Sequence, residues 1–448
     1  MKGLDDSTKR KLIKEADDLL HELFPICRSI TGPGLRDTLK IAKKKAFFEI
    51  KEFSSGETHY DWVIPDEWTI NDAYIKDSKG DKIVDFKECN LHVMNYSIPV
   101  DKTISFDGLK EHLHFLPDLP EAIPYRTSYY NKNWGFCITH NQFQTLKQNE
   151  NYQVFIDSSF KKGGLSYGET YLKGSKDDTF LIATYPCHPS LANDNLSGVV
   201  LWILLLRELS RKKLINNYQF VIHPETIGAI AFLSSNESEM LKIKGGFVIS
   251  CVAGPGNYGL KNSFLSDSIV DRACDLTLKE NKINFIKYPF DADAGSDERQ
   301  YSSPFFKIPI VTISKDKYFE YDFYHTSLDN LDFISSEALV DTLDFYLQSI
   351  DKLEKNKTYL SKNPKCEPML GKRELYPPIG GHLKQDKNSA NESDDEWEEK
   401  LKATNWLMYY SDGTNSLIDI SEKTNINFYS LYTTSKLLCE HELLEELN

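Results

Sequence analysis

A regular alternation of apolar runs and helical patterns, which begins near residue 151, constrains the fold of this chain most. The runs are short and rich in β-branched and aromatic residues, as buried strands are. Helical patterns lie between them at 196–209, 227–233 and 267–280. Strands that alternate with helices in this way predict an α/β sheet with helices on both faces. The predicted strands are YQVFID (152–157), TFLIATY (179–185), YQFVIHP (218–224), GGFVIS (245–250) and KIPIVTIS (307–314).

Two amphipathic segments precede this region and are expected to pack on the sheet. Residues 8–23 and 35–50 space their apolar side chains at helical intervals. The intervening residues 53–140 consist of short β-branched and aromatic runs separated by turn signals, which predict an inserted β-rich domain. We therefore expect a discontinuous α/β domain made of residues 1–52 and 141–382.

The C-terminal part of the chain differs from the rest in its composition and in its sequence pattern. Residues 383–397 are polar and charged, which is typical of a linker. Residues 398–448 contain three short helical patterns and predict a winged-helix-like helical domain. Its only basic residues are lysines, outnumbered by acidic residues, and an acidic module binds DNA poorly. We expect no nucleic acid partner, and instead a second copy of the chain or another protein at this domain.

Charge and cysteine usage narrow the class of protein. The net charge of −14 argues against a protein-wide electrostatic interaction with nucleic acid. The longest apolar run, VVLWILLL at 199–206, is far shorter than the roughly 18 residues that a membrane span needs. The N-terminus lacks the apolar segment of a signal peptide. The eight cysteines are scattered without a CxxC pair. We expect a cytoplasmic protein with reduced thiols and no membrane contact.

Three loops that follow predicted strands carry side chains suited to metal chemistry. His188 and Asp194 lie on the first loop, Glu225 on the second and His325 on the third. Loops at the carboxyl ends of parallel strands meet at one edge of the sheet, where ligands bind. Imidazole and carboxylate groups there can hold a divalent metal. Taken singly, the same residues also fit structural duties, with Asp194 capping a helix and each histidine lying in a solvated loop.

The motifs on these loops resemble those of the zinc-dependent aminopeptidases with the carboxypeptidase-like α/β fold. ANDNLSG is similar to the metal-binding motif of that family, and YHTSLDNLD to its terminal histidine motif. GSDERQYSSPFFKIPIV is similar to the segment that precedes its last core strand. The resemblance implies that His188, Asp194 and His325 bind zinc.

Two departures from the family pattern change the expected metal content. The family has Glu-Glu where this chain has Glu225-Thr226, so the general base is kept and a metal ligand is lost. Cys251 occupies the place of an acidic ligand and either binds zinc as thiolate or packs as a small apolar side chain. The resemblance thus favours one zinc ion, with a second as the alternative.

The whole chain resembles a bacterial group described as polysaccharide-biosynthesis proteins with an aminopeptidase-like domain. RSITGPGLR, YDWVIPDEW, GSDERQY, LGKRELYPPIGG and the helical tail carry this likeness. It implies a zinc-aminopeptidase-like mixed sheet with helices on both faces. We also expect substrate-binding residues outside the metal ligands, and the candidates are Arg28, Asp297, Glu298, Arg299 and Tyr324.

These observations predict a zinc-dependent hydrolase that cleaves a peptide or amide bond of a small substrate. In this hypothesis zinc activates a water molecule, and Glu225 accepts its proton. Glutaminyl-cyclase-like chemistry and N-deacylation of an amino sugar are enzymatic alternatives on the same fold. A third alternative is a ligand-sensing or interaction protein with an altered site.

Overall fold

The computed structural model describes residues 3–376 and 394–447, which divide into two compact units. The larger unit comprises residues 4–271 and 284–346, and the smaller comprises residues 272–283 and the chain from residue 347 onward. Among the described residues, no helix combines the length and the apolar character needed to cross a bilayer.

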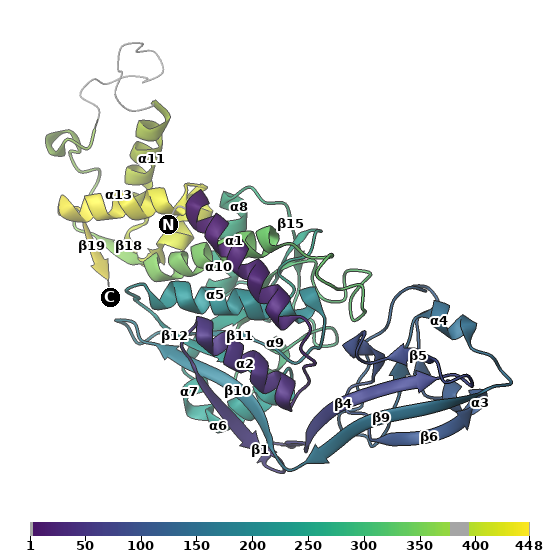
Figure 1. Cartoon of the computed structure of the whole chain (residues 1–448). Coiled ribbons are helices and arrows are strands. Elements are labelled where there is room, and N and C mark those ends of the chain that lie inside the picture. Colours follow the sequence, from purple (N-terminus) through teal and green to yellow (C-terminus); the bar gives the residue numbers. More distant parts are fainter. Residues whose placement is uncertain (1–2, 377–393, 448) are drawn as a thin grey trace. The chain divides into compact units, whose positions relative to one another are not determined.

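An eight-stranded mixed sheet forms the centre of the larger unit (Figure 1). β11 is parallel to both β12 and β13, and β13 is parallel to β16. The pairs β1–β10, β10–β12 and β14–β16 are antiparallel. The mixed α/β sheet predicted from the sequence is therefore confirmed. In spatial order the strands are β1 (Glu49–Ser54), β10 (Gly164–Leu172), β12 (Asn217–Ile222), β11 (Thr179–Thr184), β13 (Ile243–Val248), β16 (Ile310–Lys315), β14 (Tyr258–Lys261) and β15 (Phe285–Tyr288).

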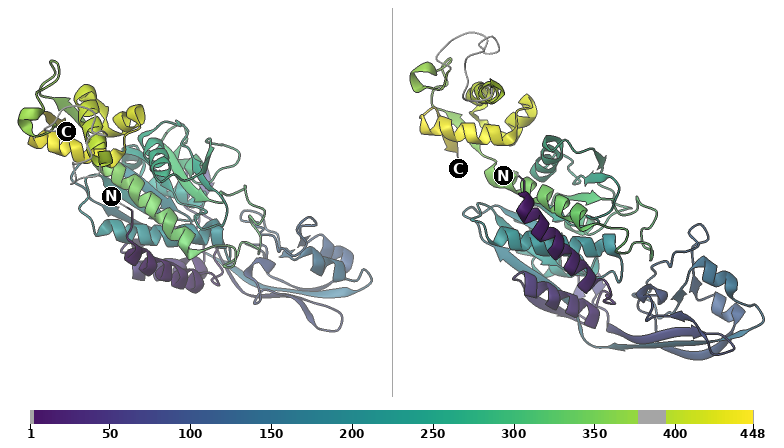
Figure 2. Two further views of the ribbon diagram at one scale, coloured as in Figure 1. Left: turned by 90° about the horizontal axis from the view of Figure 1, so that it is seen from above. Right: turned by 45° about the horizontal axis from the view of Figure 1, so that its top comes forward.

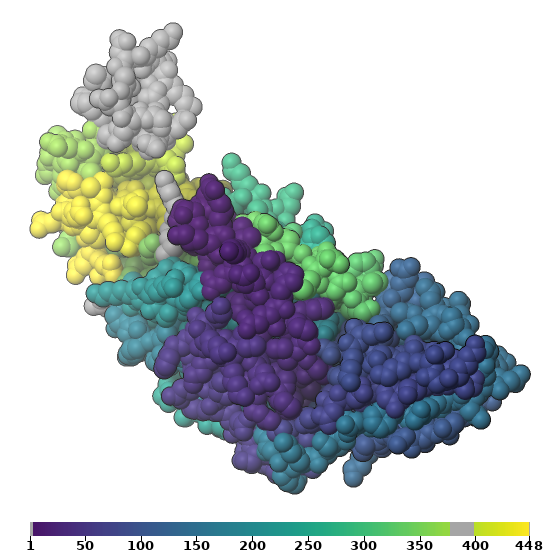
Figure 3. All heavy atoms as spheres, in the orientation of Figure 1, coloured from purple at the N-terminus to yellow at the C-terminus, as the bar shows by residue number. Residues whose placement is uncertain are grey.

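Helices cover both faces of this sheet, as predicted. In β12, Phe220 meets Trp202 of α5 (Gly198–Ser210), whereas its neighbour Val221 belongs to a cluster with Phe232 of α6 (Ile227–Ser235). Successive side chains of a strand point to opposite faces, so α5 and α6 lie on opposite sides. α1 (Asp6–Leu23) and α2 (Pro33–Lys45) pack on α5. The space-filling view shows these N-terminal residues, in purple, on the outer surface of that layer (Figure 3).

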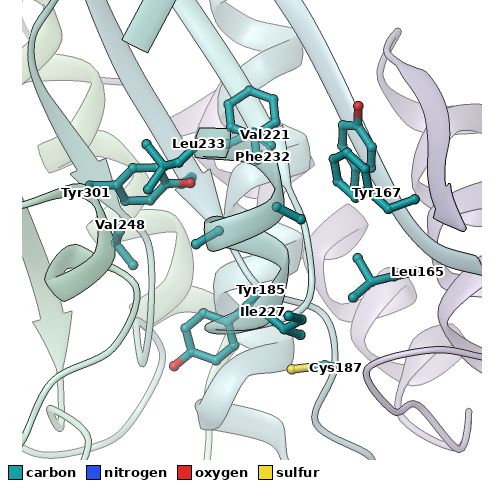
Figure 4. Packing of buried hydrophobic residues seen from close by; sticks show 14 of the residues in the cluster. Leu165, Tyr167, Tyr185, Cys187, Val221, Ile227, Phe232, Leu233, Val248 and Tyr301 are labelled. Atoms are coloured by element: carbon teal, nitrogen blue, oxygen red, sulfur yellow. The ribbon is translucent and has the colours of Figure 1, made fainter. Parts of the chain in front are cut away.

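The buried cluster under α6 extends to the loops at the carboxyl end of the sheet. Leu233 and Val248 lie in its interior, while Tyr185 and Cys187 mark its end beyond β11 (Figure 4). Loops that rest on such a packed core hold their side chains in fixed positions. The larger unit also contains α7 (Glu237–Met240) and α9 (Glu298–Tyr301), whereas α8 (Ile269–Glu280) and α10 (Ser336–Lys355) each contribute residues to both units.

The β-rich insert contains a four-stranded sheet of its own, in the order β5-β4-β9-β6. Its long strands β4 and β9 run antiparallel side by side (Figures 1 and 2). The strands are β4 (Glu67–Lys76), β5 (Lys82–Asp85), β6 (Val100–Ser105) and β9 (Asn151–Lys161). Two short pairs accompany them, β2 (Thr58–His59) with β3 (Trp62–Val63) and β7 (Leu113–His114) with β8 (Phe136–Cys137). The helices are η1 (Asn90–His92), α3 (Phe106–Lys110) and α4 (His140–Thr145).

The location of β9 differs from the prediction, which placed YQVFID in the large sheet. Tyr152, Val154 and Ile156 are buried in the core of the insert, and the residues between them are less buried. A strand in the middle of an α/β sheet is buried on both faces, whereas this one has a single buried face. The exact domain boundaries stay a prediction.

The smaller unit contains a three-stranded sheet, in the order β18-β17-β19, accompanied by helices. Arg272 of α8 forms ion pairs with Asp419 at 2.7 Å and with Glu422 within this unit. Of the predicted linker, residues 383–393 lie outside the described residues, and α11 begins at Asp394. The elements are β17 (Thr358–Ser361), η3 (Gly371–Arg373), α11 (Asp394–Tyr410), β18 (Asp412–Ser416), α12 (Leu417–Thr424), α13 (Phe428–Glu440) and β19 (Leu444–Leu447).

Candidate metal centre

The loops after β11, β12 and β16 bring four predicted site residues together at the carboxyl edge of the sheet. His188 and Asp194 follow β11, and Asp194 lies within the irregular helical segment η2 (Ala192–Ser197) that leads into α5. Glu225 follows β12, and His325 follows β16. The topology therefore makes neighbours of residues that are far apart in the sequence.

His188, Asp194 and His325 form a group whose candidate ligand atoms all lie within 4.8 Å of one another. Asp194 Oδ2 lies 3.0 Å from His325 Nε2 and 4.0 Å from His188 Nε2. The side chains of Asp194 and His188 are buried, while that of His325 is 30% exposed. Two imidazoles and a carboxylate, open to the surface on one side, fit a zinc ion that keeps a position for water.

The protonation of this group suits metal binding. Burial lowers the pKa of His188 to about 4, so this imidazole is neutral at pH 7. Burial alone would raise the pKa of Asp194, but His188, His325 and a hydrogen bond from Tyr185 hold it at about 2. A neutral imidazole and an ionised carboxylate are the forms that bind metal ions.

Two residues that the sequence analysis did not assign to the site hold Asp194 in place. The Tyr185 hydroxyl donates to Asp194 Oδ1 at 2.7 Å and lies 2.6 Å from Ser250 Oγ. The Asp329 carboxylate accepts backbone N–H groups from Asn193 at 2.6 Å and from Asp194 at 3.0 Å. Both contacts fix the orientation of the carboxylate that faces the histidines. Asp329 lies within the YHTSLDNLD motif, which was the available signal for it.

Glu225 has the location expected of a general base. Its Oε2 lies 3.8 Å from His188 Nε2, and its Oε1 accepts a hydrogen bond of 2.6 Å from Ser296 Oγ. Burial, together with the charge of Asp194, raises the pKa of Glu225 to about 7. One carboxylate oxygen is thus held in place while the other faces the metal group.

Cys251 follows β13 and is fully buried. It is not part of the group formed by His188, Asp194 and His325. Its Sγ accepts a hydrogen bond of 3.4 Å from Ser250 Oγ, and burial raises the pKa of the thiol well above its usual value. This buried, protonated thiol packs as a small apolar side chain.

The three predicted substrate-binding residues of the GSDERQ segment do not reach the pocket wall. Asp297 is buried, and its Oδ1 accepts the backbone N–H of Thr226 at 2.7 Å. Glu298 is buried in an ion pair with Lys261. Arg299 donates to the backbone carbonyl group of Ser296. Of these three contacts, that of Asp297 with Thr226 holds the loop of Glu225.

The remaining two candidates lie beside the metal group. The Tyr324 ring stacks on His325 with 3.9 Å between ring centroids. Arg28 is 1% exposed, and its Nε donates to the backbone carbonyl of His188 at 3.0 Å. Its Nη1 donates to the carbonyl of Leu23, so the guanidinium connects the His188 loop to the end of α1.

A pocket of about 290 Å³ opens at His188, Glu225 and His325. Its opposite wall comes from the insert, which the sequence analysis did not connect with the site. The insert contributes Trp62, Tyr125, Thr127, Tyr129 and Tyr130. The aromatic side chains therefore come from two separate segments of the insert.

The eight-stranded sheet and this arrangement at its carboxyl edge define a protein with an aminopeptidase-like fold. Among solved structures, a zinc aminopeptidase from Bacillus subtilis shares the fold, with a TM-score of 0.57, 12% identity and 77% of this chain and 94% of that chain covered. An aminopeptidase from Aneurinibacillus sp. strain AM-1 gives a TM-score of 0.50 with 14% identity, covering 76% and 93%.

A family model and relatives with higher sequence identity show the family to which the chain belongs. The model described as "Domain of unknown function (DUF4910)" matches residues 17–356, and a winged helix-turn-helix model matches residues 357–446. The chain belongs to the family described by the first of these models, DUF4910. A Clostridium acetobutylicum relative named "Putative polysaccharide biosynthesis protein with aminopeptidase-like domain" is 44% identical over 431 residues, or 96% of each chain. The crystal structure of a "putative peptidase" from the same organism has a TM-score of 0.89 and 41% identity, covering 98% of each chain.

Proposed function

We propose that this chain is a zinc-dependent hydrolase that cleaves an amide bond of a small substrate with an activated water molecule. The observation that carries the proposal is the arrangement of His188, Asp194 and His325 within 4.8 Å, with the Glu225 carboxylate 3.8 Å from His188. Three protein ligands with an adjacent carboxylate are the usual composition of a hydrolytic zinc site. The aminopeptidase-like fold supports the same class of reaction.

Each residue then has a defined task in the reaction. Bound zinc would lower the pKa of water and polarise the substrate carbonyl group. Glu225 Oε2 faces the metal group and accepts the proton of the attacking water, while Ser296 holds Oε1. Glu225 subsequently delivers this proton to the leaving amine. Tyr185 and Asp329 keep the Asp194 carboxylate oriented throughout.

Metal analysis of two variants beside the wild type tests the proposal. Glu225→Gln should keep one zinc ion per chain and lose amide hydrolysis, because it removes the base and leaves the ligands. His188→Ala should lose the zinc ion. The matched controls are Glu88→Gln and His21→Ala, whose side chains are exposed and lie outside the site.

Two results would contradict the proposal. Undiminished hydrolysis in Glu225→Gln would exclude Glu225 as the base, and normal zinc content in His188→Ala would exclude that ligand. A wild-type protein that binds no zinc and cleaves no amide would instead support the ligand-sensing alternative.

A further inference from the structure

The insert is attached directly to the loop that carries His325. The backbone N–H of Tyr125 donates to the carbonyl group of His325 at 2.8 Å. The backbone N–H of Ser327 donates to the carbonyl group of Ile123 at 2.9 Å, and Ser327 Oγ accepts the N–H of Ile123. Because these bonds join the backbones, the insert holds its aromatic side chains at a fixed distance from the metal group.

This attachment places an aromatic wall opposite the reacting groups. The ring of Tyr125 lies 5.3 Å from that of His188 and 5.2 Å from that of His325. Further out, the rings of Trp62 and Tyr130 meet edge to face at 5.6 Å. These two side chains are 37% and 52% exposed, so both retain surface for a ligand. Planar, apolar groups pack well on such rings.

Among the residues that the structure describes, the charged groups around the pocket offer no carboxylate that is free to pair with a cationic ligand group. Within the described part of the chain, Glu225 is the one carboxylate that lines the pocket, and no lysine or arginine lines it. Asp194 does not line the pocket: its Oδ1 accepts a hydrogen bond from Tyr185, and its Oδ2 lies 3.0 Å from His325 Nε2. The neutral Thr226 is the neighbour of Glu225 in the lining. An ammonium group at this depth would need Glu225, which the proposed reaction uses as its base, and burying an unpaired charge is costly.

We propose that the pocket receives the uncharged acyl group of an N-acylated amine, so that the enzyme removes this acyl group instead of releasing a residue with a free α-amine. The inference rests on the proposed function and specifies its substrate class. In the reaction R–CO–NH–R′ + H₂O → R–COO⁻ + R′–NH₃⁺, the C–N bond breaks and a C–O bond forms. The proton that Glu225 takes from water goes to the amine nitrogen. The acyl group R packs against Trp62 and Tyr130.

Two substrates that differ only in the α-amine test the cleavage step. The zinc-loaded protein is assayed with 3-phenylpropanoyl-p-nitroanilide and with phenylalanyl-p-nitroanilide. The neutral compound should have a kcat/KM at least about tenfold higher, since the cationic one brings an unpaired charge into the pocket. A higher kcat/KM for the phenylalanyl compound would overturn the inference and favour binding of the ammonium by the aromatic rings.

A binding measurement on the metal-free protein separates this inference from the proposed function. Calorimetric titration with 3-phenylpropanamide should show tighter binding than titration with phenylalaninamide. Trp62→Ala should weaken binding of the neutral amide about fivefold, and Phe47→Ala, a fully separate exposed aromatic, should leave it unchanged. If the protein prefers the neutral amide but cleaves no amide, the proposed hydrolase activity would be refuted and the acyl pocket would stand. Equal binding of both amides, no binding of either, or no effect of Trp62→Ala would refute the acyl pocket.

Discussion

Removal of the Tyr185 hydroxyl tests the support of Asp194, the proposed metal ligand, without changing Asp194 itself. In Tyr185→Phe the ring keeps its packing in the buried cluster beside β11, and only the oxygen is lost. That oxygen donates to Asp194 Oδ1 at 2.7 Å and lies 2.6 Å from Ser250 Oγ. A hydrogen bond to a charged group contributes about 1.5–3 kcal/mol. At about 1.4 kcal/mol per factor of ten, zinc affinity should fall about 10- to 100-fold.

Competition with a chromophoric chelator at pH 7 measures this change in zinc affinity. Tyr171→Phe is the matched control, because Tyr171 is half-exposed and its hydroxyl contacts Thr179 at the start of β11, the end of that strand away from the ligand loop. Thermal denaturation of the metal-free protein should also show a loss of about 1.5–3 kcal/mol, because the same hydrogen bond to the Asp194 carboxylate is absent. Zinc affinity within twofold of the wild type, in a variant that still folds, would refute the idea that Tyr185 orients the ligand.

Two further predictions concern the buried groups around the centre. Arg28→Lys should weaken zinc binding about tenfold, because lysine cannot donate to the carbonyl groups of both His188 and Leu23. Chelator competition measures this affinity, and an unchanged value would contradict the prediction. Burial lowers the pKa of His223 to about 4, below the unfolded value of about 6.5, so its contribution to stability is full above pH 6.5 and is lost as the pH falls toward 4. Urea denaturation should show that His223→Gln removes about 2 kcal/mol of the stability difference between pH 7 and pH 5, and an unchanged pH profile would contradict the assignment.

The fold was predictable because its signals are local. Apolar runs such as TFLIATY and YQFVIHP alternate with helical patterns, and this alternation alone predicts a sheet covered on both faces. The exception is YQVFID, whose short apolar run does not reveal which of two sheets it joins. That choice depends on pairing with β4, which lies more than seventy residues earlier in the chain.

The grouping of His188, Asp194 and His325 was predictable for a related reason. His188, Asp194 and His325 each follow a predicted parallel strand, so the topology by itself requires them to lie at one edge of the sheet. The topology brings these loops together in space, but it does not determine which of their side chains face the pocket. Asp297 and Arg299 lie in the right segment, but a backbone contact with Thr226 and a carbonyl contact with Ser296 direct them away from it.

The aromatic wall could not be predicted because it depends on contacts between distant segments. Nothing in the sequence marks Trp62 or Tyr130 as pocket residues. The insert brings them to the site through its backbone bonds with the His325 loop and through the contact of β2 with α6. The resulting pocket lining contains the neutral Thr226 beside Glu225, together with several aromatic rings. A pocket that encloses an uncharged group with rings needs no second carboxylate for an amine. The neutral lining at Thr226 and the rings of the insert together favour the uncharged acyl group that we propose as the ligand.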